Sequence, residues 1–241
     1  MRRPLARRAG LQGGEAAAGR AGVLGGAAAW VALLLAFPAV VAGAGKDLTE
    51  DYLDLPGSFS FVRRAPQGAE PGRVKMLVFE DFLCPLCYDL VTRVVEPLKA
   101  RYGDRLEVAF AAYPVAAESS SVPAQAYAVA RAMGIGAEMQ EALFRARFEE
   151  RVAIDTGDGL AWVASRLGLD AQHFLARLEA GDGRALVERE LALGRRYHIE
   201  GVPGVVLEGW IRVNDLSRQN LETIIGGLLA RKGIGEGRGA Q

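Results

Sequence analysis

Cysteine, histidine and lysine are scarce in this 241-residue chain, which has two cysteines, two histidines and four lysines. So few cysteines exclude a disulfide-dense scaffold and a four-cysteine metal site. Basic and acidic residues both number 29, and this zero net charge argues against a nucleic-acid-binding protein. The sequence also shows no internal repeat and no nucleotide-binding glycine loop. Half of the residues are apolar, which is enough for a packed core and excludes wholesale disorder.

The first 44 residues differ in composition from the rest. Residues 1–20 carry five arginines and one acid, whereas residues 21–44 carry no charge. The densest apolar part, Trp30 to Phe37, is shorter than the roughly 20 residues of a spanning helix, and Ala42-Gly43-Ala44 suits a signal peptidase. We expect a signal peptide over 1–44, with an uncleaved membrane anchor at 21–44 as the alternative. Both place the folded part outside the cytoplasm, for example in the periplasm.

Strand patterns occur in two groups. Residues 57–63, 73–79 and 105–111 form the first group, and residues 201–207 and 210–213 form the second, joined at the turn Glu208-Gly209. In the strand at 73–79, Val74, Met76 and Val78 share one face. The two groups predict a central mixed sheet.

Helical spacing follows the cysteines as far as residue 102, with a kink expected at Pro97. A long stretch without strand patterns comes next, and a last helix begins after Ser217. We therefore predict an α/β protein with helices on both sides of its sheet and an inserted all-helical subdomain at about 119–197. The domain should cover 57–232, after a flexible acidic lead-in at 45–56 and before a disordered glycine-rich tail at 233–241.

The two cysteines form the motif Cys84-Pro85-Leu86-Cys87 where a strand gives way to a helix. Cys84 is expected at the helix N-cap and Pro85 at the first helical position. The helix dipole and its free N–H groups then favour the thiolate of Cys84, which is the attacking form in disulfide exchange. Cys87 lies one turn further along the same helix face. Cys84 is therefore interpreted as the exposed attacking sulfur and Cys87 as the buried resolving one.

Two other interpretations of the cysteine pair are weaker. A zinc site would need two more ligands, and His173 and His198 are 25 residues apart on separate predicted helices or their ends. We expect both histidines to be surface or satisfied core residues, and no metal. A purely structural disulfide would close only a short loop and so constrain the unfolded chain little.

A second motif is Val202-Pro203, where a proline begins a predicted central strand. Proline is out of place there unless it serves a purpose. A cis peptide bond would turn the N–H and C=O of Val202 toward an incoming extended chain and bring this loop beside the sulfurs. We predict that cis bond, against the alternative of an ordinary trans proline in a turn.

The residues from Phe79 to Cys87, Tyr113-Pro114, the helical block and Gly201-Val-Pro-Gly204 together resemble a DsbA-like thiol–disulfide oxidoreductase of the thioredoxin superfamily. The resemblance covers roughly 59–231 and implies a thioredoxin fold with a helical insertion. It also implies that Cys84 is the nucleophile, Cys87 the resolving cysteine and Val202-Pro203 the substrate-contacting loop. No cofactor is implied.

Two departures from the family pattern concern the tuning of the site. The best-known oxidases have His where this chain has Leu86, beside Pro85, so one helper for the thiolate is missing. Many members carry a buried acid where this chain has Val78. Glu80 and Asp81 are the nearest candidates for a proton relay, and the alternative is two solvated acids at a strand end.

The predicted reaction is dithiol–disulfide exchange with cysteine-containing exported proteins through a mixed disulfide at Cys84. A membrane redox partner is expected to re-oxidise or re-reduce the pair. The alternatives are a reductase or isomerase on the same scaffold, and a non-catalytic binding module whose cysteines are structural.

Overall fold

The computed structural model describes residues 48–65 and 72–233. The predicted leader at 1–44 and the predicted tail after 233 lie outside these ranges. Within them, no helix is long and apolar enough to cross a membrane.

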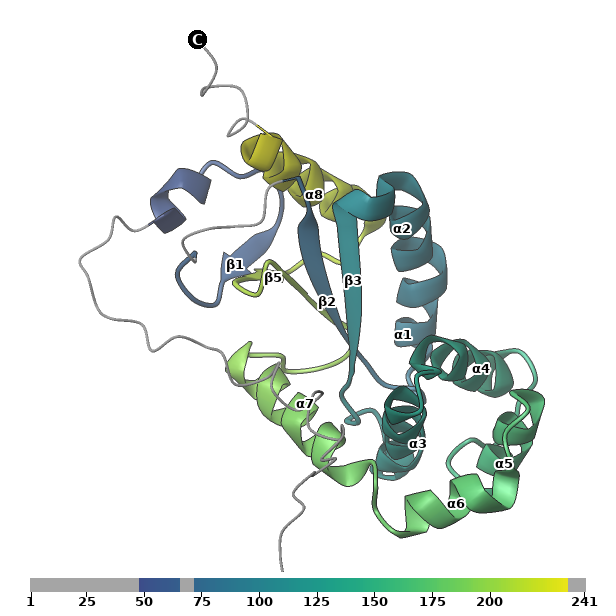
Figure 1. The fold of residues 1–241 in the computed structure, drawn as a ribbon. Helices are drawn as coiled ribbons and strands as arrows, with labels where there is room; N and C mark the ends of the chain where they lie inside the picture. Colours follow the sequence, from purple (N-terminus) through teal and green to yellow (C-terminus); the bar gives the residue numbers. More distant parts are fainter. Residues whose placement is uncertain (1–47, 66–71, 234–241) are drawn as a thin grey trace, which may run out of the picture. The chain divides into compact units, whose positions relative to one another are not determined.

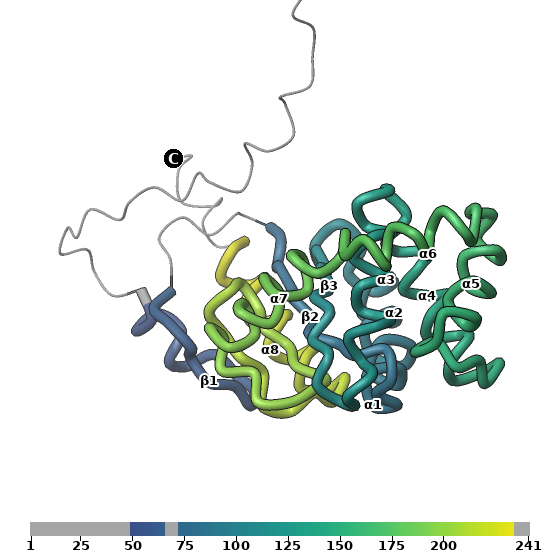
Figure 2. The backbone as a smooth tube through the Cα atoms, turned by 90° about the horizontal axis from the view of Figure 1, so that it is seen from below, coloured from purple at the N-terminus to yellow at the C-terminus, as the bar shows by residue number. Residues whose placement is uncertain are grey.

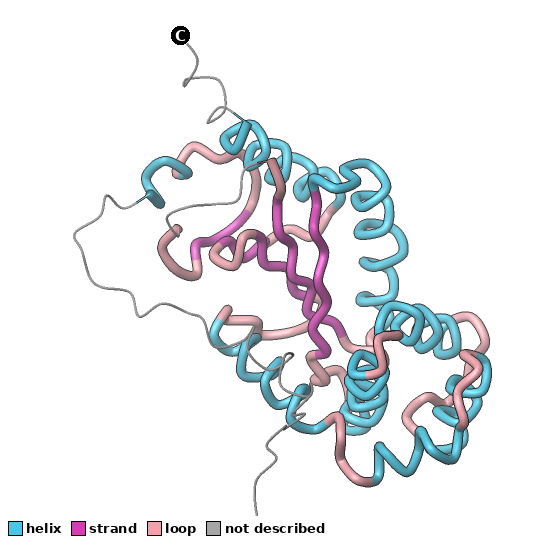
Figure 3. Tube along the Cα trace, viewed as in Figure 1, coloured by secondary structure: helices cyan, strands magenta, loops and turns pink. Residues whose placement is uncertain are grey.

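Five strands form one mixed sheet, as predicted, in the order β1-β5-β4-β2-β3 (Figures 1 and 3). Strand β2 is parallel to β3 and antiparallel to β4, and β5 pairs antiparallel with both β4 and β1. The strands are β1 (Phe59–Phe61), β2 (Val74–Glu80), β3 (Leu106–Ala112), β4 (Gly204–Leu207) and β5 (Ile211–Val213). The two predicted groups are therefore interleaved, because β2 lies beside β4 and β1 pairs with β5 at the edge.

Alternating side chains of β2 face two different layers. Val74, Met76 and Val78 pack in one core with apolar residues of α1 (Pro85–Leu90), α2 (Glu96–Tyr102) and α8 (Arg218–Gly233). Phe79 packs on the other face with Tyr113, against residues of α7 (Arg184–Arg196) and the turn after it. The period-two pattern of β2 therefore produces helices on both sides of the sheet.

The helix that begins at Pro85 is interrupted before Pro97. A π-helical segment, η3 (Val91–Val95), joins α1 to α2. Pro97 lies in the first turn of α2, and because proline has no N–H it cannot continue the hydrogen-bond ladder of the preceding turns. The disturbance predicted at Pro97 thus takes the form of a π-helical turn.

Four helices between β3 and α7 form the inserted block. They are α3 (Ser121–Ala132), α4 (Gly136–Phe148), α5 (Gly157–Arg166) and α6 (Ala171–Glu179), after a short 3-10 turn, η5 (Glu118–Ser120). Figure 2 shows them gathered together, away from β1. Their apolar side chains form one core with Phe82 and both cysteines. The inserted helices therefore pack against the segment that holds the two cysteines.

Helix α7 differs from the prediction that it belongs wholly to the inserted block. Its C-terminal half covers the sheet, where Leu191 and Leu193 pack against the core around Phe79. Gly194 allows this approach, since a Cβ there would lie 2.2 Å from Cε2 of Tyr113. The insertion that stands apart from the sheet is accordingly shorter than 119–197.

The predicted flexible lead-in at 45–56 packs on the domain from residue 48 onward. A 3-10 helix, η2 (Leu48–Tyr52), places the Tyr52 ring edge-on to Trp210 with centroids 4.7 Å apart. Leu55 is buried in the core beside α8. A few apolar side chains among the acids supply enough buried area to order this segment.

Candidate active site

The motif Cys84–Cys87 lies at the junction of β2 and α1, as predicted. Cys84 is the N-cap residue of α1 with an extended backbone, and Pro85 is the first helical residue. The carbonyl of Cys84 accepts hydrogen bonds from the N–H groups of Cys87 and Tyr88 at 3.1 and 3.3 Å. Cys84 therefore lies at the positive end of the helix dipole.

Cys84 is less exposed than the sequence predicts. Its residue exposure is 7 %, against 0 % for Cys87, so the prediction of an exposed attacking sulfur is wrong for this state. One contact comes from a segment 118 residues further along the chain: Sγ of Cys84 lies 3.8 Å from the carbonyl oxygen of Val202, with the thiol donating. Both cysteines are free thiols in the structure.

The Val202–Pro203 peptide bond is cis, as predicted. It immediately precedes β4, whose Gly204 and Val205 pair with Phe79 and Val78 of β2. Because β2 leads into the cysteine motif, this pairing holds the two segments together across 118 residues of sequence.

Leu86 projects from the motif with 64 % of its surface exposed, and Val115, after Tyr113-Pro114, is 49 % exposed. The loop that holds Val115 is joined to the motif through Asp81, which accepts from the N–H of Val115 and the N–H of Leu83. The two segments therefore each present an exposed apolar side chain.

Cys87 is enclosed by the protein. Burial is the largest cause of a raised pKa for its thiol, so its thiolate is strongly disfavoured. The N–H of Asp81 points at its Sγ from 3.4 Å and acts in the opposite direction. Any step that releases Cys87 as a thiolate therefore benefits from a nearby proton donor.

Glu80, the last residue of β2, is fully buried, and the alternative of a solvated acid is wrong. Its Oε1 and Oε2 accept from Nε2 of Gln140 at 2.7 and 2.8 Å. Burial raises the pKa of Glu80 from 4.5 to about 8, although the Gln140 hydrogen bond lowers it. A carboxyl with such a pKa exchanges its proton near neutral pH, as a relay requires.

Asp81 is also buried, but its partners are different. Oδ1 accepts from the N–H of Leu83 at 2.9 Å, and Oδ2 accepts from those of Val115 and Ala116, each at 2.8 Å. These three backbone donors tie the cysteine loop to the segment after β3. The geometry therefore suits a positioning role for Asp81 better than a relay.

Sequence reasoning missed Gln140 and the buried Glu190, which pairs with the partly exposed Arg131. Glu190 accepts from the Arg131 guanidinium and from the N–H of Ala112. Burial is the largest cause of a raised pKa for Glu190. Gln140 and Glu190 each lie among apolar residues on a helix face, a signal that polar residues in an apolar stripe have a specific buried partner.

His173 and His198 are both exposed, on α6 and in the turn after α7. Among residues 48–65 and 72–233, no three His, Cys, Asp or Glu side chains are grouped as a metal site would need.

Comparison with known proteins gives one family. The family model of the DSBA-like thioredoxin domain matches residues 75–225. The thiol:disulfide interchange protein DsbA of Burkholderia cepacia is 26% identical over 151 residues, covering 61% of this chain and 70% of that protein. The protein of the same name from Pseudomonas aeruginosa is 24% identical over 147 residues, covering 60% of this chain and 67% of that protein.

Solved structures show the same fold. The oxidoreductase DsbA from Xylella fastidiosa superposes with a TM-score of 0.61 at 20% identity, covering 74% of this chain and 98% of that one. Proteus mirabilis DsbA, in complex with the non-covalently bound peptide PWATCDS, has a TM-score of 0.53 at 20% identity and covers 73% of this chain and 94% of that one. With its cysteine motif, cis-proline loop and helical insertion, this chain belongs to the family of DSBA-like thioredoxin domains and is a disulfide oxidoreductase.

Proposed function

We propose that this protein oxidises dithiols of exported proteins to disulfides, with Cys84 as the attacked sulfur and Cys87 as its partner. The observation that carries the proposal is the position of the Cys84 sulfur, at the N-terminus of α1 and 3.8 Å from the carbonyl oxygen of Val202. A helix N-terminus stabilises the reduced thiolate, and a stabilised reduced form makes the disulfide a stronger oxidant.

The reaction begins with the Cys84–Cys87 disulfide. A substrate thiolate attacks Sγ of Cys84, a substrate–Cys84 disulfide forms, and Cys87 leaves as a thiolate that takes the proton of Glu80. A second substrate thiolate then attacks the substrate sulfur of the mixed disulfide and releases Cys84 as a thiolate. Two electrons have passed from the substrate to the cysteine pair, and a membrane-bound redox partner removes them.

Substrate binding in this proposal uses the segment around Val202. An extended peptide beside Sγ of Cys84 would compete for the Val202 carbonyl, and exposed Leu86 and Val115 would contact its apolar side chains. The bound peptide in the Proteus mirabilis relative supports this choice of ligand class.

Export is the part of the proposal that depends on sequence alone. The arginine-rich start, the apolar run and the small residues at 42–44 support a signal peptide and a periplasmic or other extracytoplasmic location. The N-terminal residue of the protein purified from the exporting cell tests this. Retention of Met1 on a membrane-bound protein would contradict cleavage and support the anchor.

The central experiment traps the mixed disulfide. Cys87→Ser leaves the nucleophile but removes the resolving sulfur, so covalent adducts with an unfolded test protein that carries a disulfide should accumulate on a non-reducing gel. Cys84→Ser, the matched control, should form none and lose exchange. Full oxidase activity in both single variants would contradict the proposal.

A further inference from the structure

The partner of Glu80 is unusual for a buried carboxyl. In the described part of the chain, its oxygens accept hydrogen bonds from one neutral amide, Gln140 of α4, 60 residues away in sequence. The nearby Glu190 is bound instead by the Arg131 guanidinium and a backbone N–H. A guanidinium keeps its charge and so holds its carboxylate ionised, whereas an amide does not.

An amide can satisfy both charge states of a carboxyl. Its NH₂ group donates to the carboxylate, and in the protonated acid its carbonyl can accept from the hydroxyl while the NH₂ group donates to the other oxygen. Glu80 can therefore gain or lose a proton without leaving a buried polar atom unpaired, which would cost about 1–3 kcal/mol.

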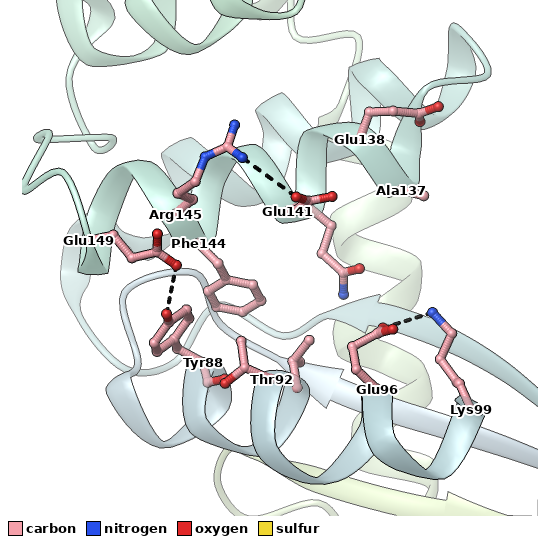
Figure 4. A pocket seen from close by; sticks show the side chains of 12 residues that line it. Tyr88, Thr92, Glu96, Lys99, Ala137, Glu138, Glu141, Phe144, Arg145 and Glu149 are labelled. Atoms are coloured by element: carbon pink, nitrogen blue, oxygen red, sulfur yellow. Dashed lines mark hydrogen bonds and ion pairs between the residues drawn. The ribbon is translucent and has the colours of Figure 1, made fainter. Parts of the chain in front are cut away.

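Gln140 also borders solvent. It lines a groove of about 530 Å³ between the α1–η3–α2 helix and α4. Figure 4 shows Tyr88 and Thr92 on one wall and Phe144 and Arg145 on the other. Glu80 is fully buried, and Gln140, which donates to it, is the residue that separates the carboxyl from the groove.

We propose that Gln140 is a positioning residue that lets Glu80 change its protonation state in place, with the adjoining groove as the route of the proton to solvent. This inference rests on the proposed function, in which Glu80 serves Cys87. When a substrate thiolate breaks the Cys84–Cys87 bond, Cys87 leaves with the electron pair and takes the Glu80 proton. Gln140 then donates to the carboxylate until groove water returns a proton.

Other ionisable groups face Glu80 from the surrounding elements. Glu190 of α7 and Asp81 of the cysteine loop oppose its ionisation, and Arg131 of α3 favours it. Tyr127 of α3 and Cys87 of α1 are near enough for their pKa values to respond to Glu80. These groups are unchanged in variants of Gln140, so a shift in such a variant reports on the amide itself.

The test uses two substitutions with opposite expected signs. Gln140→Met removes the donor at similar volume, and Gln140→Lys supplies a fixed positive charge. The titration midpoint of the Glu80 carboxyl, followed by ¹³C NMR and assigned with Glu80→Gln, should rise by about one pH unit in the first and fall by about one in the second. One pH unit is a tenfold change in the protonation equilibrium. Gln172→Met, at an exposed glutamine of α6, is the control and should not move it.

The second measurement is the rate at which glutathione opens the Cys84–Cys87 disulfide, as a function of pH. The inflection of this rate profile should shift together with the titration midpoint of Glu80. The inference is overturned if the Glu80 titration midpoint does not shift, or if it shifts in the same direction in both Gln140 variants. It is also overturned if the midpoint shifts but the pH profile of disulfide opening does not. If one variant does not fold, the direction of the midpoint shift in the other still tests the inference. Loss of all exchange in Cys84→Ser but a wild-type profile in Glu80→Gln would instead contradict the relay role of Glu80 in the proposed function.

Discussion

Glu80→Gln is predicted to change how stability depends on pH. Burial raises the pKa of Glu80 in the folded protein from 4.5 to about 8, and the unfolded chain should keep the ordinary value. Between these values the folded state binds one more proton than the unfolded state. The stability associated with protonated Glu80 is therefore fully present below about pH 4.5 and is lost as the pH rises through 8.

The size of the effect follows from that window. Within this window, each rise of one pH unit lowers the free energy of unfolding of the wild-type protein by up to about 1.4 kcal/mol. Over the whole interval from pH 4.5 to 8 the loss is about 5 kcal/mol. Gln at position 80 cannot ionise and still has Gln140 as a neighbour. The stability of Glu80→Gln relative to wild type should therefore rise by up to about 5 kcal/mol between pH 4.5 and 8.

Urea unfolding of both proteins across this range, followed by far-UV circular dichroism with the cysteines kept reduced, measures the difference. Glu138→Gln is the matched control, because Glu138 is exposed on the same helix as Gln140, and its difference from wild type should stay nearly constant. A difference between Glu80→Gln and wild type that does not change with pH would refute the account of Glu80 as a buried, late-titrating acid.

Three other substitutions test the site and the fold. Leu86→His adds a donor beside the Cys84 thiolate and should raise the reduction potential by tens of millivolts, where 30 mV is about 1.4 kcal/mol, in a glutathione equilibrium. Asp81→Ala leaves three backbone N–H groups without their acceptor and should lower stability by roughly 2–4 kcal/mol in urea unfolding, whereas a change under 1 kcal/mol would contradict its positioning role. Gly194→Ala should lower the melting temperature by several degrees, because its Cβ would lie 2.2 Å from Tyr113; an unchanged melting temperature would show that α7 moves aside at little cost.

Features that depend on neighbouring residues could be predicted from the sequence. Cys84 at the N-cap and Pro85 in the first turn follow from rules that span a few positions. The common face of Val74, Met76 and Val78 follows from the period of a strand.

Features that depend on distant residues could not be predicted in this way. Cys84 contacts Val202, which is 118 residues away in sequence, and the buried Glu80 is paired with Gln140, which is 60 residues away. Sequence patterns around Glu80 are equally compatible with a solvated acid. The family resemblance implies a helical insertion beside the cysteine motif, but it does not identify which side chain of the insertion binds Glu80.

The lead-in and α7 show a related limit. Leu55 lies among acidic and turn-forming residues, so its local pattern predicts a loose segment, although the face of α8 that buries it is far away in sequence. Similarly, the helical pattern of α7 does not reveal that Gly194 packs on Tyr113 of the segment after β3. Tertiary contacts decide both.

The reduction potential of the Cys84–Cys87 pair is the most direct test of the oxidase proposal. The helix N-terminus stabilises the reduced form, but Leu86 provides no hydrogen bond and no charge, so the account predicts an intermediate value. It should lie between the roughly −270 mV of thioredoxin and the roughly −120 mV of the strongest thiol oxidants when measured against glutathione. A potential at or below that of thioredoxin would contradict the oxidase and favour a reductase on the same scaffold.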